Sequence, residues 1–348
     1  MRVGVLTGGG DCPGLNAVIR AVTKSLLGQN LAEVIGIEDG FLGLAENRTR
    51  ALDWRSVSGI AARGGTVLGT TNSFDPLATP AATQAVLDNA NALGLQALVA
   101  IGGDGTMTIA HALQQRGLAC VGVPKTIDND IEGTERSFGF DTAVATITEA
   151  LDRVQTTAQS HGRVMLVEAM GRNAGWLALE AGIAGAADAI LLPEIDYDLE
   201  VLVARCRERE QGQRFTVICV AEGAKPRGGE QTVEQRIEGR PEPVRLGGVA
   251  HVLRAQLQAR LATEVRATVL GHVQRGGTPT PFDRVLATHY GNAAAELVRE
   301  QRFGTMVAWQ RGAMTSVPLA AVAGRSRCVP LDHPLLRCAE QIGVCLGR

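Results

Sequence analysis

The chain has 348 residues, of which 45% are hydrophobic and 20% charged, and this length allows two domains or one large α/β unit. The 34 basic and 36 acidic residues nearly cancel, so the overall charge draws the chain neither to nucleic acid nor to an anionic membrane. An anionic ligand must therefore be bound by positive charge that is concentrated locally.

The seven cysteines are scattered and show no CxxC spacing, which argues against a disulfide framework and against a structural zinc site. The N-terminal residues MRVGVLTGGGDCPG reach glycine too early to supply the apolar core of a signal peptide. No apolar run is long enough to cross a bilayer. We therefore expect a cytoplasmic protein with no membrane partner.

Short apolar runs alternate with helical segments along the chain. Residues 3–6 are predicted to form a strand, GGGDCPG at 8–14 breaks it, and residues 15–27 have helical periodicity. The pattern returns with a strand at 96–101, followed by GGDGT at 102–106 and a helix that runs to about Gln115. Further strands are predicted at 120–123, 164–167, 189–192, 216–220 and 267–270.

This alternation predicts parallel sheets that are covered by helices on both faces. Ligands of such sheets bind where the carboxyl ends of strands meet loops, and we expect every motif below to lie at such an end. The polar, proline-containing segment 225–245 is predicted to be a mobile surface excursion. Because no linker composition marks a boundary, we expect two interwoven domains.

The GGDGT motif at 102–106 combines a glycine pair with the start of a helix. Glycines let the backbone approach phosphate oxygens, and a helix N-terminus favours anions. Asp104 would repel phosphate unless a cation lies between them, and Mg²⁺ resolves this conflict. The same letters also fit a plain strand–helix turn that is capped by an aspartate. NAD kinases and diacylglycerol kinases share the motif, so alone it indicates only a nucleotide site.

Two further loops carry glycines or carboxylates. GGGDCPG at 8–14 opens a helix, but Asp11 and Pro13 break the GxGxxG spacing, which disfavours a Rossmann oxidoreductase. TIDND at 126–130 suits a general base that takes a proton from a hydroxyl, although an Asx-turn loop has the same composition. The neighbouring Lys125 favours the first interpretation, because a cation there neutralises phosphate charge.

Four arginines lie near strand ends or in glycine loops with apolar neighbours. Guanidinium groups bind phosphate bidentately and neutralise charge in phosphoryl transfer. Any one of them alone is better explained as a solvated surface ion pair, but four in such contexts favour an anion site. His272 is predicted to bind substrate or to pack structurally rather than to act as a base. The four arginines are Arg163, Arg172, Arg266 and Arg275.

Together these segments resemble the ATP- and pyrophosphate-using phosphofructokinase family. The resemblance runs in order through GGGDCPGLNAVIR, GGTVLGTT, GGDGT, PKTIDND, GFDTA, VEAMGRNAGW and RATVLGHVQRGG, to about Arg284. It spans most of the chain, and the ordered combination is highly specific. About the last sixty residues match only loosely.

The resemblance implies Mg²⁺-dependent transfer of the γ-phosphoryl group of ATP to the C1 hydroxyl of fructose 6-phosphate. Asp128 would be the base, Arg172 would stabilise the transferring group, and Lys125 would neutralise charge. Asp104 would bind Mg²⁺, with Asp130 supporting the metal or the loop. The donor would be held by Gly10, Gly103, Gly105 and Thr106.

The resemblance also implies a set of sugar-phosphate ligands. Arg163 and Arg266 would reach the 6-phosphate from a neighbouring subunit, so we expect a homodimer or homotetramer with shared active sites. The remaining ligands would be Thr126, Asp128, Met170, Gly171, Arg172, Glu222, His272 and Arg275.

Three positions bear on the choice of phosphoryl donor in this family. Gly105 leaves room for the α-phosphate of ATP, where an aspartate would favour pyrophosphate. Lys125 is typical of pyrophosphate enzymes, and Asn72 replaces an arginine that many ATP-using members carry. The chain thus resembles a mixed subgroup with Gly105 and Lys125. We weight Gly105 most heavily, because a steric and charge block is harder to bypass than an extra cation, and we expect ATP.

Three other functions are alternatives to an ATP-dependent phosphofructokinase. The nearest is the pyrophosphate-dependent, reversible phosphofructokinase reaction. An NAD kinase-like enzyme would share only GGDGT and would leave TIDND and HVQRGG unexplained. A non-catalytic sugar-phosphate-binding paralogue is expected to have lost Asp104, Asp128 or Arg172, and all three are present.

The expected fold class is α/β, with two three-layer α/β/α domains and mainly parallel sheets, as in phosphofructokinases. The donor-binding domain is expected to comprise residues 1–139 and about 279–327. The sugar-phosphate-binding domain is expected to comprise residues 140–278 and about 328–348.

Overall fold

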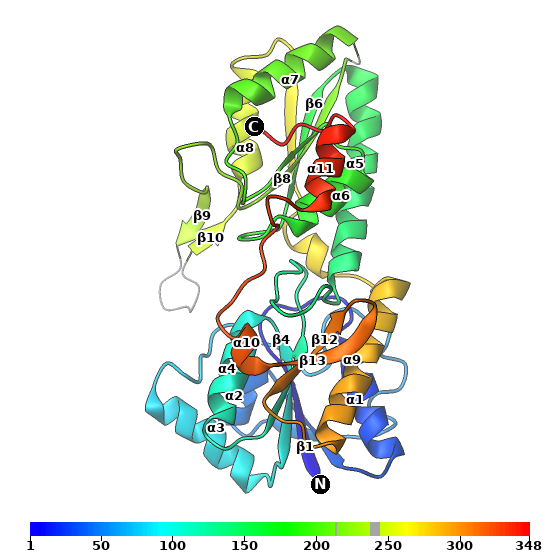
Figure 1. Ribbon diagram of the computed structural model, residues 1–348, viewed down its shortest axis with the longest axis vertical. Helices are drawn as coiled ribbons and strands as arrows, with labels where there is room; N and C mark the ends of the chain where they lie inside the picture. Colours follow the sequence, from blue (N-terminus) through cyan, green and yellow to red (C-terminus); the bar gives the residue numbers. More distant parts are fainter. Residues whose placement is uncertain (213, 237–243) are drawn as a thin grey trace. The chain divides into compact units, whose positions relative to one another are not determined.

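A computed structural model describes residues 1–212, 214–236 and 244–348, and the chain divides into two compact units (Figure 1). The first unit comprises Met1–Thr142 and Arg275–Ser326. The second comprises Ala143–Gln274 and Arg327–Arg348. The chain therefore passes from one unit to the other three times.

The first unit is built on a mixed sheet of seven strands, counted over its described residues, in the order β13-β12-β5-β4-β1-β2-β3. The five inner strands are parallel, and the two edge strands pair antiparallel with their neighbours. The central strands β4 and β5 are wholly buried, as apolar strands covered on both faces must be. The strands are β1 (Arg2–Thr7), β2 (Glu33–Ile37), β3 (Thr49–Leu52), β4 (Ala97–Gly102), β5 (Cys120–Pro124), β12 (Thr305–Gln310) and β13 (Ala313–Pro318).

Helices cover both faces of this sheet. One face packs against α2 (Gly40–Ala45), α3 (Pro80–Ala92), α4 (Asp104–Gln114) and α10 (Leu319–Val322) (Figure 1). The helices α1 (Leu15–Gly28) and α9 (Pro281–Arg299) belong to the other helical layer and pack against each other. They meet at Gly291, where a Cβ would lie 2.6 Å from the Cβ of Ala21 and 2.8 Å from the carbonyl oxygen of Val18. A larger residue would force these helices apart.

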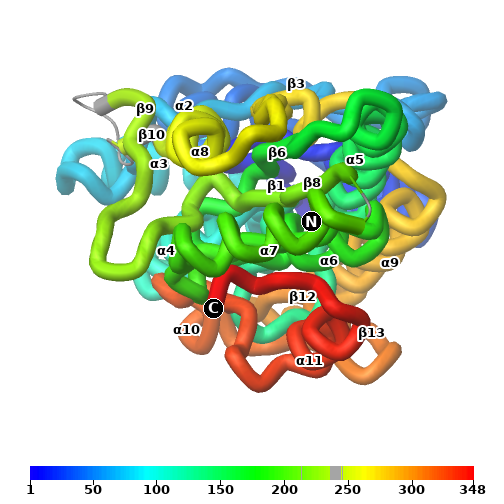
Figure 2. Tube along the Cα trace, turned by 90° about the horizontal axis from the view of Figure 1, so that it is seen from above, coloured from blue at the N-terminus to red at the C-terminus, as the bar shows by residue number. Residues whose placement is uncertain are grey.

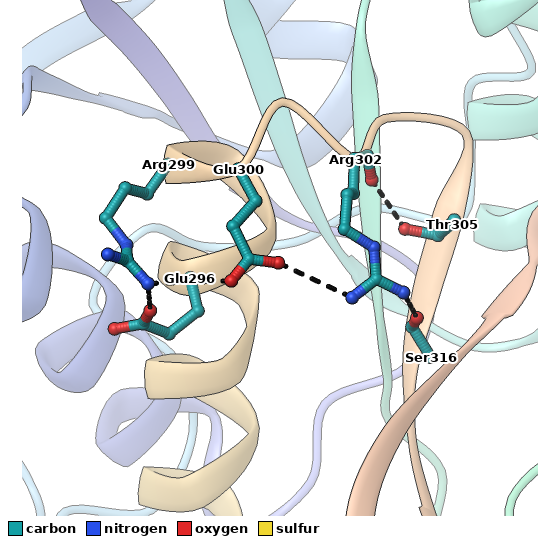
Figure 3. Close-up of polar contacts among 6 residues, drawn as sticks. All are labelled: Glu296, Arg299, Glu300, Arg302, Thr305 and Ser316. Atoms are coloured by element: carbon teal, nitrogen blue, oxygen red, sulfur yellow. Dashed lines mark hydrogen bonds and ion pairs between the residues drawn. The ribbon is translucent and has the colours of Figure 1, made fainter.

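Polar contacts attach the end of α9 to the edge of the sheet (Figure 3). Arg302 donates to Ser316 Oγ of β13 at 2.6 Å, and Thr305 Oγ1 donates to the carbonyl oxygen of Arg302 at 2.7 Å. Arg299 and Arg302 also form ion pairs with glutamates of the last turn, Glu296 and Glu300. These side chains are exposed to water, so each ion pair stabilises the fold by less than about 1 kcal/mol.

The second unit contains a parallel sheet of four strands, counted within the described ranges, in the order β11-β6-β8-β7. Its strands are β6 (Val164–Ala169), β7 (Ala189–Leu191), β8 (Thr216–Ala221) and β11 (Val265–Val269). The helices α7 (Leu199–Gly212) and α8 (Val249–Gln258) share a core with one face. On the other face, Gly182 of α6 (Trp176–Ala184) lies against Ile190 and Cys219, and α5 (Phe140–His161) packs against the end of α6.

The C-terminal segment returns to the second sheet after α11 (Pro334–Gln341). Cys345 forms a parallel bridge with Ala189 beside β7, and Arg205 of α7 donates to the carbonyl oxygen of Gly343 at 2.6 Å. Figure 2 shows this segment, in red, ending beside α7. The chain end is therefore part of the second unit's core.

The predicted surface excursion at 225–245 contains an antiparallel pair of short strands, β9 (Val233–Arg236) and β10 (Val244–Leu246). The part of the prediction that falls on residues 237–243 lies outside the described residues. In the described part of the chain, β9 and β10 form a separate two-stranded sheet that pairs with neither large sheet.

The predicted α/β fold with mainly parallel sheets is confirmed. Each predicted strand is present, with β11 beginning at Val265 because that side chain is buried. The strands β2, β3, β12 and β13 were not predicted. Across the described residues, no helix combines the length and hydrophobicity that a membrane span requires.

The side chain of Asp283 is buried and hydrogen-bonded at the start of α9. Asp283 is fully buried, and its Oδ2 accepts hydrogen bonds from the backbone N–H of Thr142 at 2.8 Å and from the Thr142 hydroxyl at 2.5 Å. Thr280 caps the same turn by accepting from the N–H of Asp283. Burial raises the pKa of Asp283 from 3.8 to about 6 despite these bonds.

This raised pKa predicts a pH-dependent loss of stability. Between about pH 4 and pH 6 only the unfolded chain releases the proton, so the free energy of unfolding should fall by up to about 3 kcal/mol as pH rises through this range. Denaturant titrations give the free energy of unfolding of the wild type and of Asp283→Asn, which has no proton to release. As pH rises through this range, the value for the wild type should fall relative to that for the variant. The exposed Asp88→Asn change is the control. If the free energies of unfolding of wild type and Asp283→Asn changed equally with pH, the prediction would be contradicted.

Candidate active site

Three loops of the first unit follow the carboxyl ends of adjacent strands. The sheet order places β1 between β2 and β4, and β5 on the other side of β4. Residues 8–14 follow β1, residues 103–106 follow β4, and residues 125–130 follow β5. All three loops therefore lie along one edge of the sheet, which is where open α/β sheets bind ligands.

The GGDGT loop is interlocked with the first glycine loop through Thr106. Its side chain is buried, and a Cβ at Gly8 would lie 2.6 Å from its Oγ1. A Cβ at Gly102 would overlap both Oγ1 and Cβ of Thr106. Thr106, expected to bind the donor, therefore also holds the two glycine loops in contact.

The other residues of this loop are open to ligands. Asp104 and Gly105 are exposed and form the first turn of α4, an eleven-residue helix whose N-terminus favours an anion. Apart from its chain neighbours and the backbone of its own helix, no atom of the described residues lies within 4 Å of a Cβ placed on Gly105. Packing within the described chain therefore does not require glycine at this position, although glycine weakens a helix by about 1 kcal/mol relative to alanine.

Two cations lie against the loop that follows β1. Lys125 is buried, and its Nζ donates to the carbonyl oxygen of Gly10. Burial lowers the pKa of Lys125. Arg275 donates from Nη1 to the carbonyl oxygen of Asp11 at 3.3 Å. The structure thus places Arg275, expected to bind the sugar phosphate, beside Gly10 in the first unit.

The same loop contains a buried thiol. Cys12 Sγ donates to the carbonyl oxygen of Phe138 at 3.6 Å, and burial raises its pKa to about 12. The loop is further attached to residues 64–71, because Thr70 donates to the carbonyl oxygen of Gly9 at 2.6 Å. Asn72, which follows that segment, is exposed.

The TIDND loop alternates between buried and accessible side chains. Ile127 is fully buried, whereas its neighbours Thr126 and Asp128 are partly exposed. The Thr126 hydroxyl donates to Asp130 Oδ1 and accepts from the N–H of Asp128, both at 3.0 Å. This arrangement fixes the backbone that carries Asp128.

The carboxylates of this edge suit a divalent cation. Burial raises the pKa of Asp130, and the negative charge of Asp104 raises it further. Mg²⁺ is commonly bound by one or two carboxylates together with substrate phosphates. Asp104 and Asp130 therefore fit a Mg²⁺ site that needs phosphate oxygens for completion. Among the described residues, no group of three or more metal-binding side chains is already assembled.

The second unit contributes three further loops, which follow β6, β8 and β11. The loop after β6 carries Met170, Gly171 and Arg172, and Gly171 adopts a φ of 125° that favours glycine. Glu222 follows β8, and its N–H donates to the carbonyl oxygen of Ala169 at 2.8 Å. These loops lie at one edge because β6 is the neighbour of both β8 and β11. The exposed His272 lies in a 3₁₀ turn just beyond β11.

Arg163 and Arg266 lie at the opposite edge of this sheet. Arg163 directly precedes β6, Arg266 is the second residue of β11, and both form ion pairs with Glu264. The length of β6, about 16 Å, separates them from the Arg172 loop. The expectation that every motif lies at the carboxyl end of a strand is therefore wrong for these two arginines. Within one chain they are not brought together with Arg172 and Glu222.

The sequence patterns missed the residues that hold these loops in place. The N–H of Met170 donates to Gln274 Oε1 at 3.0 Å, and the N–H of Gly175 donates to Glu194 Oε1 at 3.0 Å. Gln231 donates to the carbonyl oxygens of Arg172 and Gly223. These contacts join positions 8 to 104 residues apart, and each has a backbone atom as one partner, so no residue pattern could have indicated them.

The fold and the loops define an α/β protein whose strand ends present glycines, carboxylates and cationic side chains, which are the groups that suit phosphate and Mg²⁺. A family model described as Phosphofructokinase matches residues 2–298. The chain belongs to the phosphofructokinase family, and the resemblance predicted from its ordered motifs is confirmed.

Two relatives illustrate how closely this family matches. The chain is 48% identical to the ATP-dependent 6-phosphofructokinase 2 of Clostridium perfringens, over 99% of this chain and 97% of the relative. It is 47% identical to the pyrophosphate--fructose 6-phosphate 1-phosphotransferase of Streptomyces coelicolor, over the whole of both chains. Similarity alone therefore extends to proteins named for either donor.

Solved structures agree with the fold. A phosphofructokinase from Saccharomyces cerevisiae superposes with a TM-score of 0.79 at 30% identity, covering 92% of this chain and 45% of the yeast chain. A pyrophosphate-dependent phosphofructokinase from Marinobacter aquaeolei gives a TM-score of 0.83 at 19% identity, covering 99% of this chain and 92% of that chain. The second likeness supports the fold alone.

Two of the three glycines in the GGDGT motif, Gly102 and Gly105, should respond oppositely to alanine. Gly102→Ala forces its Cβ into Thr106 and should lower the free energy of unfolding by about 1–3 kcal/mol. Gly105→Ala adds a methyl group in open space within a helix and should raise it by up to about 1 kcal/mol. Denaturant unfolding of both variants checks the prediction. Equal effects would show that Thr106 does not pack tightly against Gly102.

Proposed function

We propose that this protein is an ATP-dependent 6-phosphofructokinase. It transfers the γ-phosphoryl group of Mg²⁺-bound ATP to the C1 hydroxyl of fructose 6-phosphate, which yields fructose 1,6-bisphosphate in glycolysis. The observation that carries the proposal is the edge formed by β1, β4 and β5. It combines a fixed carboxylate at Asp128, an exposed helix N-terminus at Gly105 and a carboxylate pair suited to Mg²⁺.

The reaction requires positioning and charge neutralisation more than covalent chemistry. Asp128 accepts the proton of the C1 hydroxyl as oxygen attacks the γ-phosphorus, and the bond to the leaving ADP oxygen breaks. Arg172 stabilises charge on the transferring group. Asp104, supported by Asp130, would hold Mg²⁺, which neutralises phosphate charge when bound.

The donor is assigned to the first unit and the sugar phosphate mainly to the second. Gly10, Gly103, Gly105 and Thr106 surround the donor phosphates, since their loops meet at one sheet edge. Thr126 and Asp128 contact the reacting end of the sugar. The other sugar-phosphate ligands are Met170, Gly171, Arg172, Glu222, His272 and Arg275.

Two observations favour ATP over pyrophosphate as the donor. Gly105 leaves an open space at the start of α4, which the α-phosphate of a nucleotide can occupy. The Lys125 ammonium is engaged by the carbonyl oxygen of Gly10, which supports a role in holding the loop. The pyrophosphate-dependent reaction is the second candidate, favoured by the exposed Asn72 and by the Streptomyces coelicolor relative.

We also propose a homodimer or homotetramer with shared active sites, located in the cytoplasm. Arg163 and Arg266 lie at the end of the second sheet opposite Arg172, so they are placed to serve a neighbouring subunit rather than their own. Glu264 holds both side chains at that edge in the free chain.

Purified protein should form fructose 1,6-bisphosphate from fructose 6-phosphate, Mg²⁺ and ATP, and should be far slower with pyrophosphate. Asp128→Asn should lower kcat by about 10²–10⁴-fold, because the amide cannot accept the proton. A coupled assay measures both, with Asp88→Asn as the matched control. Turnover with pyrophosphate alone would reverse the donor assignment. No turnover with either donor would refute the proposed function.

Gly105→Asp should lower kcat/KM for ATP by at least about 100-fold, since a carboxylate facing the α-phosphate costs several kcal/mol. The substitution should not unfold α4, because aspartate is favourable in the first turn of a helix. Gly105→Asn, of similar size but without charge, should have a clearly smaller effect. Equal losses in both variants would indicate a steric rather than an electrostatic limit.

A further inference from the structure

The loop that carries Arg172 is held at several of its residues by side chains from distant parts of the second unit. Gln274 binds the N–H of Met170, and Glu194 binds the N–H of Gly175. Both contacts fix the ends of the segment. The carbonyl oxygen of Arg172, in the middle, is bound by Gln231 at 3.0 Å.

Gln231 solves a specific electrostatic problem. The loops after β6 and β8 approach so closely that the N–H of Gly223 donates to the carbonyl oxygen of Gly171 at 3.1 Å. A Cβ on Gly223 would overlap the carbonyl oxygen of Arg172. Because of this close approach, the carbonyl oxygens of Arg172 and Gly223 both lie within hydrogen-bonding distance of Gln231. Two neighbouring acceptors repel each other unless a donor binds both.

The side-chain amide of Gln231 supplies both hydrogen bonds. Its Nε2 donates to the carbonyl oxygen of Arg172 at 3.0 Å and to that of Gly223 at 2.9 Å. A primary amide nitrogen carries two hydrogens, so one side chain satisfies both acceptors. A glutamate would instead place a negative oxygen against two carbonyl oxygens, and a methionine would leave both without this donor.

The segment that carries Gln231 is itself anchored at both ends. Near its start, the N–H of Tyr197 donates to the carbonyl oxygen of Lys225 at 3.0 Å. Beyond β10, the buried carboxylate of Glu168 accepts from the N–H of Gly248 at 2.9 Å and from that of Ala250 at 2.8 Å. Gln231 also lines a cavity of about 490 Å³ in the second unit, together with Asn173.

We propose that Gln231 is a positioning residue for phosphoryl transfer. Its amide joins the loop of Arg172 to the loop of Glu222, so that the group that stabilises the transferring phosphoryl and the group that binds the sugar hydroxyls keep a fixed spacing. The proposal rests on the proposed function, because it assigns Gln231 to the same reaction.

The test compares two glutamines of the same segment. Gln231→Met keeps the length of the side chain but removes both hydrogen bonds, whereas Gln235→Met changes an exposed residue of β9. Because small displacements of a reacting group strongly reduce rate, Gln231→Met should lower kcat at least about 10-fold. The KM for ATP should stay within about twofold, because the proposed donor residues belong to the first unit. Gln235→Met should match the wild type in both constants.

A pH profile separates positioning from general destabilisation. In Gln231→Glu, the ionised carboxylate repels both carbonyl oxygens, but the protonated acid donates one hydrogen bond. Two carbonyl oxygens beside the carboxyl group should raise its pKa above the usual value of about 4.3, so kcat relative to wild type should rise as pH falls from about 7 to about 5. Thermal unfolding confirms that each variant is folded at the assay temperature.

Hydrogen exchange provides a readout that needs no turnover. Peptides covering residues 170–175 and 221–224 should exchange faster in Gln231→Met than in Gln235→Met, while peptides from the first unit should not change. If the wild type were inactive with both donors, the proposed function would be refuted. Faster local exchange in Gln231→Met would then still show that Gln231 joins the two loops. Unchanged kcat and unchanged exchange in Gln231→Met would overturn the role of Gln231.

Discussion

The site in the first unit depends on the contact between Thr106 and two glycines. Gly8 and Gly102 come from loops that follow different strands, and both press against the same buried side chain. This contact brings the first turn of α4 beside the loop that carries Gly10. In the proposed function both the first turn of α4 and the first glycine loop bind the donor phosphates, so loss of this contact would separate two groups of backbone N–H donors.

Charge in this site is arranged around carbonyl oxygens and carboxylates rather than in open solvent. Lys125 and Arg275 are directed to the carbonyl oxygens of Gly10 and Asp11, so positive charge lies under the loop. Asp104 and Asp130 supply negative charge next to it. The proposed donor, a polyanion with Mg²⁺, would complement both kinds of charge, and such local concentration of charge would let a chain of nearly balanced net charge bind phosphate.

The sequence predicted those parts of the protein that follow from local pattern. The strands at 3–6 and 164–167 were predicted because buried parallel strands are continuous apolar runs, and they appear as β1 and β6. The antiparallel edge strands β3 and β13 were missed because their burial alternates or is slight, which leaves no apolar run to detect. Ordered motifs identified the family, which local periodicity alone could not do.

For the site, residue types at strand ends indicated which loops matter but not how their side chains are directed. The motif of Arg275 suggests a sugar-phosphate ligand, which stays a proposal, but it gave no sign that this side chain donates to the carbonyl oxygen of Asp11. Gln231 and Gln274 were not predicted at all. Each acts on backbone atoms of the loop at 170–175, and backbone partners leave no trace in residue type.

The buried thiol of Cys12 has a consequence for the chemical durability of the protein. A thiol with a pKa of about 12 carries almost no thiolate at neutral pH, and thiolate is the species that electrophiles and peroxides attack. The cysteine in the glycine loop is therefore inert, while Cys328 and Cys338 are exposed to reagents. Oxidants and alkylating labels should therefore accumulate on the C-terminal segment and leave the loop at 8–14 unmodified.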